Sequence, residues 1–135
     1  MLTIQRLLII CAVISCIIIT SCKKYPDGPK VSFIPRKERI SNKWKIDQVL
    51  HGTNDSTNAF RNWVIEFTNK GTMIFDNGKT KTVGSWQLNN SGSDLDAFFD
   101  DDTVFFRSKI LKLEQKALWY RTKGDELEFR LAPAD

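Results

Sequence analysis

Residues 63–88 read WVIEFTNKGTMIFDNGKTKTVGSWQL, and this stretch decides the fold. Three runs within it are rich in apolar and β-branched residues that can line one face of a strand: residues 63–67, 73–75 and 80–88. Successive side chains of a strand point to opposite faces, so each run predicts a β-strand with one buried face. Residues 69–71 and 76–79 separate the runs, and each contains a glycine after polar residues, which favours a tight turn. The stretch therefore predicts three antiparallel strands in succession.

The same pattern extends to both sides of this stretch. Residues 43–50 predict a strand with Trp44, Ile46 and Leu50 on its buried face, followed by a polar loop. Beyond a longer loop at residues 89–102, four more short strands are expected: residues 103–107, 109–113, 117–122 and 126–131. Helical spacing fits nowhere well, apart from a single turn within the longer loop.

Eight closely spaced strands with turn signals between them predict an all-β fold, a small antiparallel up-and-down barrel. Closing the sheet removes the exposed edges that an open sheet would present. An open sandwich of two sheets is the alternative. We expect the barrel domain to span residues 40–131, ahead of a short tail at residues 132–135.

The first residues of the chain predict export. Arg6 supplies a positive charge, residues 7–19 are uncharged and apolar, and Thr20-Ser21 are small, an order typical of a secretory signal peptide. The apolar run is shorter than the roughly 20 residues that a membrane-spanning helix needs. We therefore expect residues 1–21 to be a signal peptide that is removed.

Residues 19–22, Ile-Thr-Ser-Cys, resemble the lipobox of bacterial lipoproteins. The resemblance implies that the Cys22 thiol is alkylated with a diacylglyceryl group, which makes the membrane the first partner. Several acyl chains together anchor a protein firmly. Residues 22–39 then comprise the lipidated cysteine and a flexible linker, because prolines, glycine and charges dominate them. Within the linker, we expect the short apolar segment at residues 31–35 to pack over the bottom of the domain.

The mature chain carries little net charge. The whole chain has a formal net charge of +4, and loss of Arg6 with the signal peptide leaves +3. Nucleic-acid-binding proteins concentrate more basic charge on one face, so nucleic acid is not an expected partner. Basic residues do outnumber acidic ones eight to two within residues 23–45, which fits either a solvated linker or contact with anionic lipid headgroups.

No catalytic or metal-binding motif is evident. Cys11 and Cys16 leave with the signal peptide and Cys22 is acylated, so we expect no disulfide. His51 is the only histidine, no Gly-x-Ser-x-Gly occurs, and a zinc site needs several His or Cys ligands. The acidic residues 94–102 offer oxygen ligands that suit calcium, but their spacing departs from the EF-hand pattern, and a solvated loop is the expectation. We therefore predict a protein that is not an enzyme and holds no cofactor or metal.

The strand motifs, taken in order, resemble those of the small lipocalin-like lipoproteins of Bacteroidetes. The matching segments are NKWKI at residues 42–46, IEFTNKGT at 65–72, GSWQL at 84–88, and ILKL followed by ALWY at 110–113 and 117–120. The resemblance covers roughly residues 40–131. It implies an antiparallel barrel and, by analogy with lipocalins, a cavity for an apolar small molecule, but it transfers no binding or catalytic residues.

The resemblance also implies a location in the bacterial cell envelope. The residues after Cys22 are Lys-Lys-Tyr-Pro, which lack the early acidic cluster that resembles a surface-export signal in the same group. We therefore expect a lipid anchor in the outer membrane, with the domain facing the periplasm.

Two interpretations of the barrel interior follow from its size. An eight-stranded barrel is just wide enough either to be filled by its own side chains or to hold one small ligand. The residues expected to line a cavity are Trp44, Phe67, Phe75 and Trp86, with Gln48 and Tyr120 as polar groups that orient the ligand. If the barrel is filled, the same residues form its core. The protein is then a structural or interaction module, an accessory subunit or an inhibitor, with a protein partner in the envelope.

Overall fold

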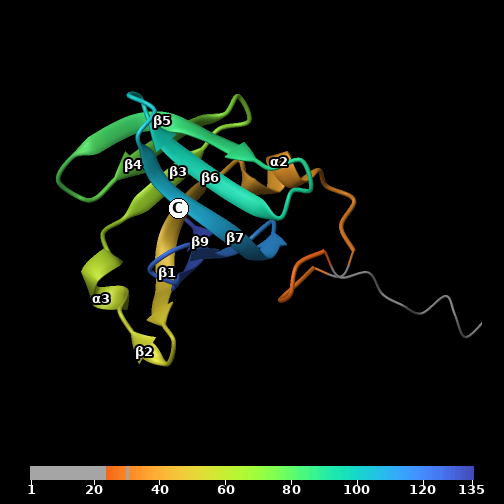
Figure 1. Cartoon of the computed structure of the whole chain (residues 1–135), viewed down its shortest axis with the longest axis horizontal. Helices are drawn as coiled ribbons and strands as arrows, with labels where there is room; N and C mark the ends of the chain where they lie inside the picture. Colours follow the sequence, from red (N-terminus) through yellow and green to blue (C-terminus); the bar gives the residue numbers. More distant parts are fainter. Residues whose placement is uncertain (1–23, 30) are drawn as a thin grey trace, which may run out of the picture.

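The computed structural model, which describes residues 24–29 and 31–135, is an eight-stranded antiparallel barrel (Figure 1). Its strands are β1 Lys43–His51, β3 Val64–Phe67, β4 Thr72–Asp76, β5 Lys81–Leu88, β6 Asp94–Phe99, β7 Val104–Glu114, β8 Ala117–Thr122 and β9 Leu127–Pro133. From β3 onward each strand pairs with the next, and β1 pairs with both β3 and β9 to close the sheet. A two-residue strand, β2 Asn54–Asp55, extends the end of β1. The predicted all-β, up-and-down barrel is confirmed.

Strand β1 changes face partway along its length. A bulge lies between Ile46 and Gln48 in the pairing with β9, so Asp47 is an extra residue. A bulge shifts the alternation of side chains by one position. Val49 is therefore fully buried while Leu50 is only half-buried, and the expectation that Leu50 shares the buried face of Trp44 is wrong.

The acidic stretch after β5 also differs from its prediction. The sequence analysis expected a loop at residues 89–102, but β6 occupies its middle and β7 is a single long strand. Leu95 and Ala97 of β6 are fully buried, whereas the alternating acids Asp94 and Asp96 lie on the other face. On β7, Ser108 is also fully buried, and its hydroxyl donates a hydrogen bond of 2.7 Å to the carbonyl of Leu95.

Two short helices lie at opposite ends of the barrel (Figure 1). Helix α2, Arg36–Ile40, covers the end that we call the closed end, where the Trp44 indole donates a hydrogen bond of 2.8 Å to the carbonyl of Ile40. Helix α3, Thr57–Phe60, lies beside the other end, the open end, and the Thr57 hydroxyl accepts a hydrogen bond from the amide of Val49. Within the described residues, neither helix has the length and apolar character needed to cross a membrane.

The chain ahead of α2 runs along the closed end of the barrel. The signal peptide and Cys22 lie outside the described residues. Tyr25, from the range expected to form a linker, is only 1% exposed, and its hydroxyl donates a hydrogen bond of 2.8 Å to the carbonyl of Gly92. The expected packing of residues 31–35 is not seen for Val31 and Phe33, which are 74% and 98% exposed.

Candidate functional site

Aromatic side chains gather at the open end of the barrel. The rings in mutual contact are Phe60, Trp63, Phe75, Phe99, Phe105, Phe106, Tyr120 and Phe129. They come from α3, the turn after it and five strands, so chain segments far apart in the sequence build one cluster. Aromatic pairs in contact contribute about 0.5–1.5 kcal/mol each beyond their buried area, so the cluster holds its shape.

Four of these rings form a nearly parallel row. Phe106 stacks on Tyr120 at 5.0 Å and 10°, and Tyr120 stacks on Phe129 at 5.3 Å and 21°. Trp63 continues the row beyond Phe129 at 6.2 Å and 15°. Phe60 closes it from the side, with its ring nearly perpendicular to Phe129 at 5.2 Å. The stacked rings together form an apolar wall.

A half-enclosed cavity of about 250 Å³ lies against this row, and we call it the open-end pocket. Its aromatic lining comprises Phe60, Trp63, Phe105, Phe106, Tyr120 and Phe129. Drug-sized pockets typically measure about 300–1,000 Å³, and an engineered apolar cavity of about 150 Å³ binds benzene. The open-end pocket is therefore matched to a small ligand of one or two rings.

The hydroxyl of Tyr120 has no hydrogen-bond partner among the described residues, although its side chain is only 1% exposed and lines the pocket. Burial alone raises the pKa of this hydroxyl well above its ordinary value, so the group stays protonated and can only be a neutral donor or acceptor. A ligand with a hydrogen-bond acceptor would therefore find a donor in an otherwise apolar lining.

Charged residues surround the pocket entrance. Lys123 forms an ion pair of 2.7 Å with Asp94, and Asp125 accepts a hydrogen bond from the hydroxyl of Thr122. Arg107 also lines the entrance, and it makes no ion pair with any residue that the structure describes. An anionic substituent on a ligand would therefore meet one free guanidinium at the rim.

The structure separates the six residues predicted to line a cavity. Tyr120 lines the open-end pocket, and Phe75 packs behind it against Trp63 at 4.8 Å. The other predicted aromatic residues lie toward the closed end: Trp44, Phe67 and Trp86.

Gln48 takes a different position, on the outer face of β1. Its side-chain oxygen accepts a hydrogen bond of 3.1 Å from Arg130 of the neighbouring strand. The structure therefore brings only Tyr120, with Phe75 behind it, to the pocket.

Most of the pocket lining was not predicted from the sequence. Phe60 and Trp63 flank the end of α3, a helix that was not predicted, and Phe105 is the extra residue of a bulge between β6 and β7. The adjacent aromatic pair Phe105-Phe106 was a usable signal. Neighbours on a regular strand point to opposite faces, so two buried aromatic neighbours require a bulge.

The described residues contain no group of three or more His, Cys, Asp or Glu side chains that converge on one point. His51 is exposed at the end of β1. Asp94 and Asp96, from the acidic stretch considered for calcium, lie on strand β6 rather than in a loop. The arrangement at the open end is thus suited to binding by apolar contact.

The fold and pocket define a small closed up-and-down β-barrel with an aromatic pocket at one end. No protein-family model matches the sequence, and no curated protein matches it. The barrel is similar to the solved structure of a protein from Bacteroides uniformis, with a TM-score of 0.54 and 14% identity over 73% of this chain and 92% of that one. It is also similar to a DUF4847 family protein from Bacteroides vulgatus, with a TM-score of 0.51 and 13% identity over 71% of this chain and 96% of that one. At these identities the likeness shows the fold alone.

Proposed function

We propose that this protein is a lipid-anchored binding protein of the bacterial cell envelope, whose lipocalin-like barrel binds one small apolar molecule in the open-end pocket. The observation that carries the proposal is the hydroxyl of Tyr120, which lines an aromatic pocket and makes no hydrogen bond with any described residue. The proposal assigns the protein no catalytic activity.

The size of the pocket limits the ligand. About 250 Å³ admits one or two fused rings, and it is too small for a sterol, a haem or a diacyl lipid. The ligand would contact the aromatic lining of the pocket and accept a hydrogen bond from Tyr120. A carbonyl or carboxylate oxygen is the expected acceptor, and a carboxylate near the rim would also attract Arg107.

Tryptophan fluorescence tests this function directly. Of the four tryptophans only Trp63 lines the pocket, so a bound ligand should change the emission of Trp63. We would titrate the full protein, purified in detergent in the form that the cell produces, with aromatic ketones, esters and carboxylates of one or two rings. The change should disappear in Trp63→Phe and persist in Trp119→Phe, because Trp119 lies on the outer face of the barrel against Arg130.

Substitution of Tyr120 tests the polar part of the proposal. Tyr120→Phe should weaken binding of acceptor-bearing ligands by about fivefold, since a neutral hydrogen bond contributes about 1 kcal/mol and each 1.4 kcal/mol is a factor of ten. Rings without an acceptor should bind both proteins equally. If no compound in the panel changes the emission of Trp63 or raises the melting temperature, the binding function is wrong.

The lipid anchor is tested separately. Mass spectrometry of the protein from bacterial membranes should find Cys22 as the first residue, carrying a diacylglyceryl group. Cys22→Ser should release the protein from the outer-membrane fraction. An unmodified Cys22 with residues 1–21 still attached would contradict the anchor without touching the binding function.

The second candidate is a structural or interaction module in which the barrel has no small-molecule ligand. The filled closed end favours it, because Trp44 is fully buried and Trp86 donates a hydrogen bond of 2.9 Å to the carbonyl of Thr68. Crosslinking in intact cells separates the candidates. A module of this kind should give one reproducible envelope protein, and a solitary binding protein should give none.

A further inference from the structure

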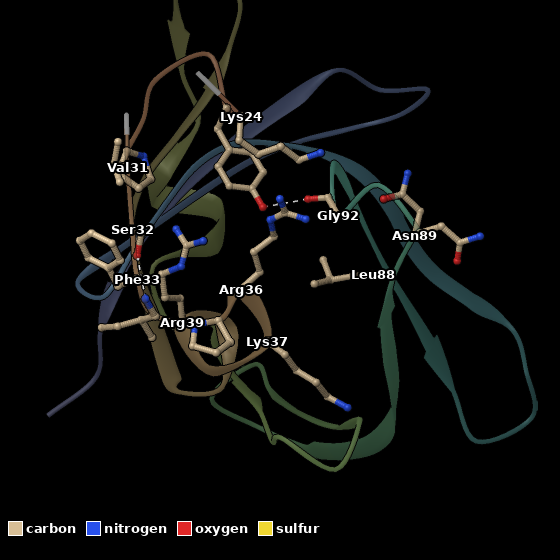
Figure 2. Close-up of a pocket in the computed structure, with 15 residues that line it drawn as sticks. Lys24, Val31, Ser32, Phe33, Arg36, Lys37, Arg39, Leu88, Asn89 and Gly92 are labelled. Atoms are coloured by element: carbon tan, nitrogen blue, oxygen red, sulfur yellow. Dashed lines mark hydrogen bonds between the residues drawn. The ribbon is translucent and has the colours of Figure 1, made fainter. Parts of the chain in front are cut away.

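A broad groove lies at the closed end, away from the open-end pocket. Its walls are the chain ahead of α2, which we call the strap (residues 24–29 and 31–35), helix α2 and the turn between β5 and β6 (Figure 2). The groove has a volume of about 600 Å³. Tyr25 fixes the strap to the β5–β6 turn through Gly92, and the amide of Asp27 donates a hydrogen bond of 2.8 Å to the carbonyl of Leu111.

Positive charge dominates this groove. Its charged lining residues are all basic: Lys24, Arg36, Lys37 and Arg39. None of the four forms an ion pair with a described residue. Figure 2 shows Arg36 and Arg39 side by side in the middle of the groove, between Phe33 and Gly92. An anion between the two guanidinium groups would gain from both.

Arg39 differs from the other three cations because it is buried. It is only 7% exposed, and it donates a hydrogen bond to the carbonyl of Leu113, but its Nε atom has no partner within the described residues. Burial lowers the pKa of Arg39 below its ordinary value. The nearest acid on α2, Glu38, lies outside the groove in a neighbouring depression. Arg39 also lines that depression, but it forms no ion pair with Glu38 or with any other described carboxylate, so an anion beside Arg39 in the groove would be favoured.

The outer wall of the groove is apolar and exposed. Phe33 is 98% exposed and Val31 is 74% exposed, the highest values among the large apolar side chains described. The next most exposed, Val83 and Val104, are 47% and 42% exposed and lie elsewhere on the barrel. Exposed aromatic and aliphatic side chains beside a cluster of cations match the boundary between lipid headgroups and acyl chains.

We propose that this groove binds the phosphate headgroup of an anionic phospholipid, so that the closed end of the barrel docks on the membrane surface. Arg36 and Arg39 contact the phosphate, and Phe33 and Val31 enter the upper part of the acyl layer. The site is independent of the open-end pocket, which then faces away from the bilayer. The strap begins two residues after Cys22, so an anchor there brings the groove within reach of lipid.

Photo-crosslinking tests the docking with the full protein. We would place the photoreactive residue p-benzoylphenylalanine at position 33, and at position 83 as the control, because Val83 is also exposed but far from the groove. The purified protein would be reconstituted into vesicles of phosphatidylcholine alone or mixed with phosphatidylglycerol. The anchor acts equally in both vesicles, so a difference between them reports the groove.

We expect lipid adducts at position 33, few at position 83, and a higher yield with phosphatidylglycerol. Arg36→Gln with Lys37→Gln should lower that yield at least fivefold, since each basic group near an anionic surface contributes a factor of about five. The matched control, Lys79→Gln with Lys81→Gln, removes the same charge from the β4–β5 turn and the first residue of β5, where Lys81 pairs with Asp76 at 3.8 Å, and should leave the yield unchanged. All four side chains are exposed, and unchanged melting curves would show that the variants fold.

Three results would overturn the proposal. Equal yields from the two vesicle types, or no effect of the groove variant, would show that no anionic headgroup is bound. Loss of the adduct on adding inorganic phosphate at constant ionic strength would assign the groove to free phosphate. Protein adducts rather than lipid adducts at position 33 in whole cells would assign it to a protein partner.

Discussion

Gly84 shows how closely neighbouring strands approach inside this barrel. It lies on β5 with its missing side chain directed at the backbone carbonyl of Phe98 on β6, closer than any van der Waals contact, and 3.2 Å from the Cε atom of Met73. Because backbone cannot move aside as a flexible side chain can, a methyl group here would push β5 and β6 apart.

Gly84→Ala should therefore lower the free energy of unfolding by about 3 kcal/mol, the upper part of the range for overpacked cores. Gly52→Ala is the matched control. Gly52 has a φ of +61° and open space around it, so the cost should be about 1 kcal/mol from backbone strain alone. Urea denaturation measures both. Equal costs for the two variants would contradict the close approach of β5 and β6.

At the scale of the strands, the outer face of β8 and β9 carries an ionic network. Glu128 accepts a hydrogen bond of 3.0 Å from Arg121 and one of 2.9 Å from Arg130. Arg130 also lies over the ring of Trp119, 4.3 Å from its centroid. Burial by itself raises the pKa of Glu128, but the hydrogen bonds and charges of the two arginines outweigh it and hold the pKa below its ordinary value.

This network makes stability depend on pH. A carboxyl whose pKa is lower in the folded state adds stability that is complete above its unfolded pKa and is lost as pH falls through the folded pKa. Glu128→Gln should therefore lower the free energy of unfolding at pH 7 and have little effect near pH 2. The measurement is urea denaturation across that range. The same loss at both pH values would show that packing, rather than charge, explains the effect.

The strands also show what the sequence could and could not predict. Alternation placed β1, β3, β4, β5, β8 and β9 correctly within a few residues, because each buries apolar side chains on one face. It failed where polar residues occupy the interior or where a bulge shifts the alternation. Ser108 is buried inside β7, Asp47 shifts the face of β1, and the acids of β6 resemble a loop.

Most of the open-end pocket could not be predicted from the sequence either. Its wall depends on α3, a four-residue helix that carries Phe60 into place by contacts with β1 that no local pattern encodes. Trp63 follows α3 and contacts Phe60, Phe75 and Phe129. Tyr120 was predicted because it lies on a regular strand with Leu118.

Removal of the Trp63 ring should show how much the aromatic cluster stabilises the barrel. Trp63→Ala should lower the free energy of unfolding by about 3 kcal/mol, at the lower end of the range for aromatic truncation, because the residue is only half-buried. Trp119→Ala, on the outer face, should cost clearly less. Thermal and urea unfolding measure both, and equal losses would mean that the aromatic cluster does not stabilise the open end.

For the whole molecule, the proposed anchor at Cys22 would make the strap set the distance between the barrel and the membrane. Tyr25 is fixed against the closed end, and only Lys23 and Lys24 separate it from Cys22. Three residue steps span at most about 10 Å. If the strap came loose as far as Arg36, the same anchor would allow roughly 50 Å. In the proposed anchored form, the packing of Tyr25 against the closed end would therefore keep that end at the bilayer surface.

Tyr25→Ala should release the strap and leave the barrel folded, since α2 and all eight barrel strands begin after it. With the lipid on Cys22, neutron reflectometry on a supported bilayer should show the protein layer extending farther from the membrane than in the wild type. Trypsin should also cleave within the strap much faster, while residues 43–133 stay resistant. Tyr25→Phe keeps the ring and loses only the hydrogen bond to Gly92, so it should behave nearly as the wild type. If Tyr25→Ala leaves both the layer thickness and the cleavage rate unchanged, contacts other than those of the Tyr25 side chain hold the strap against the barrel.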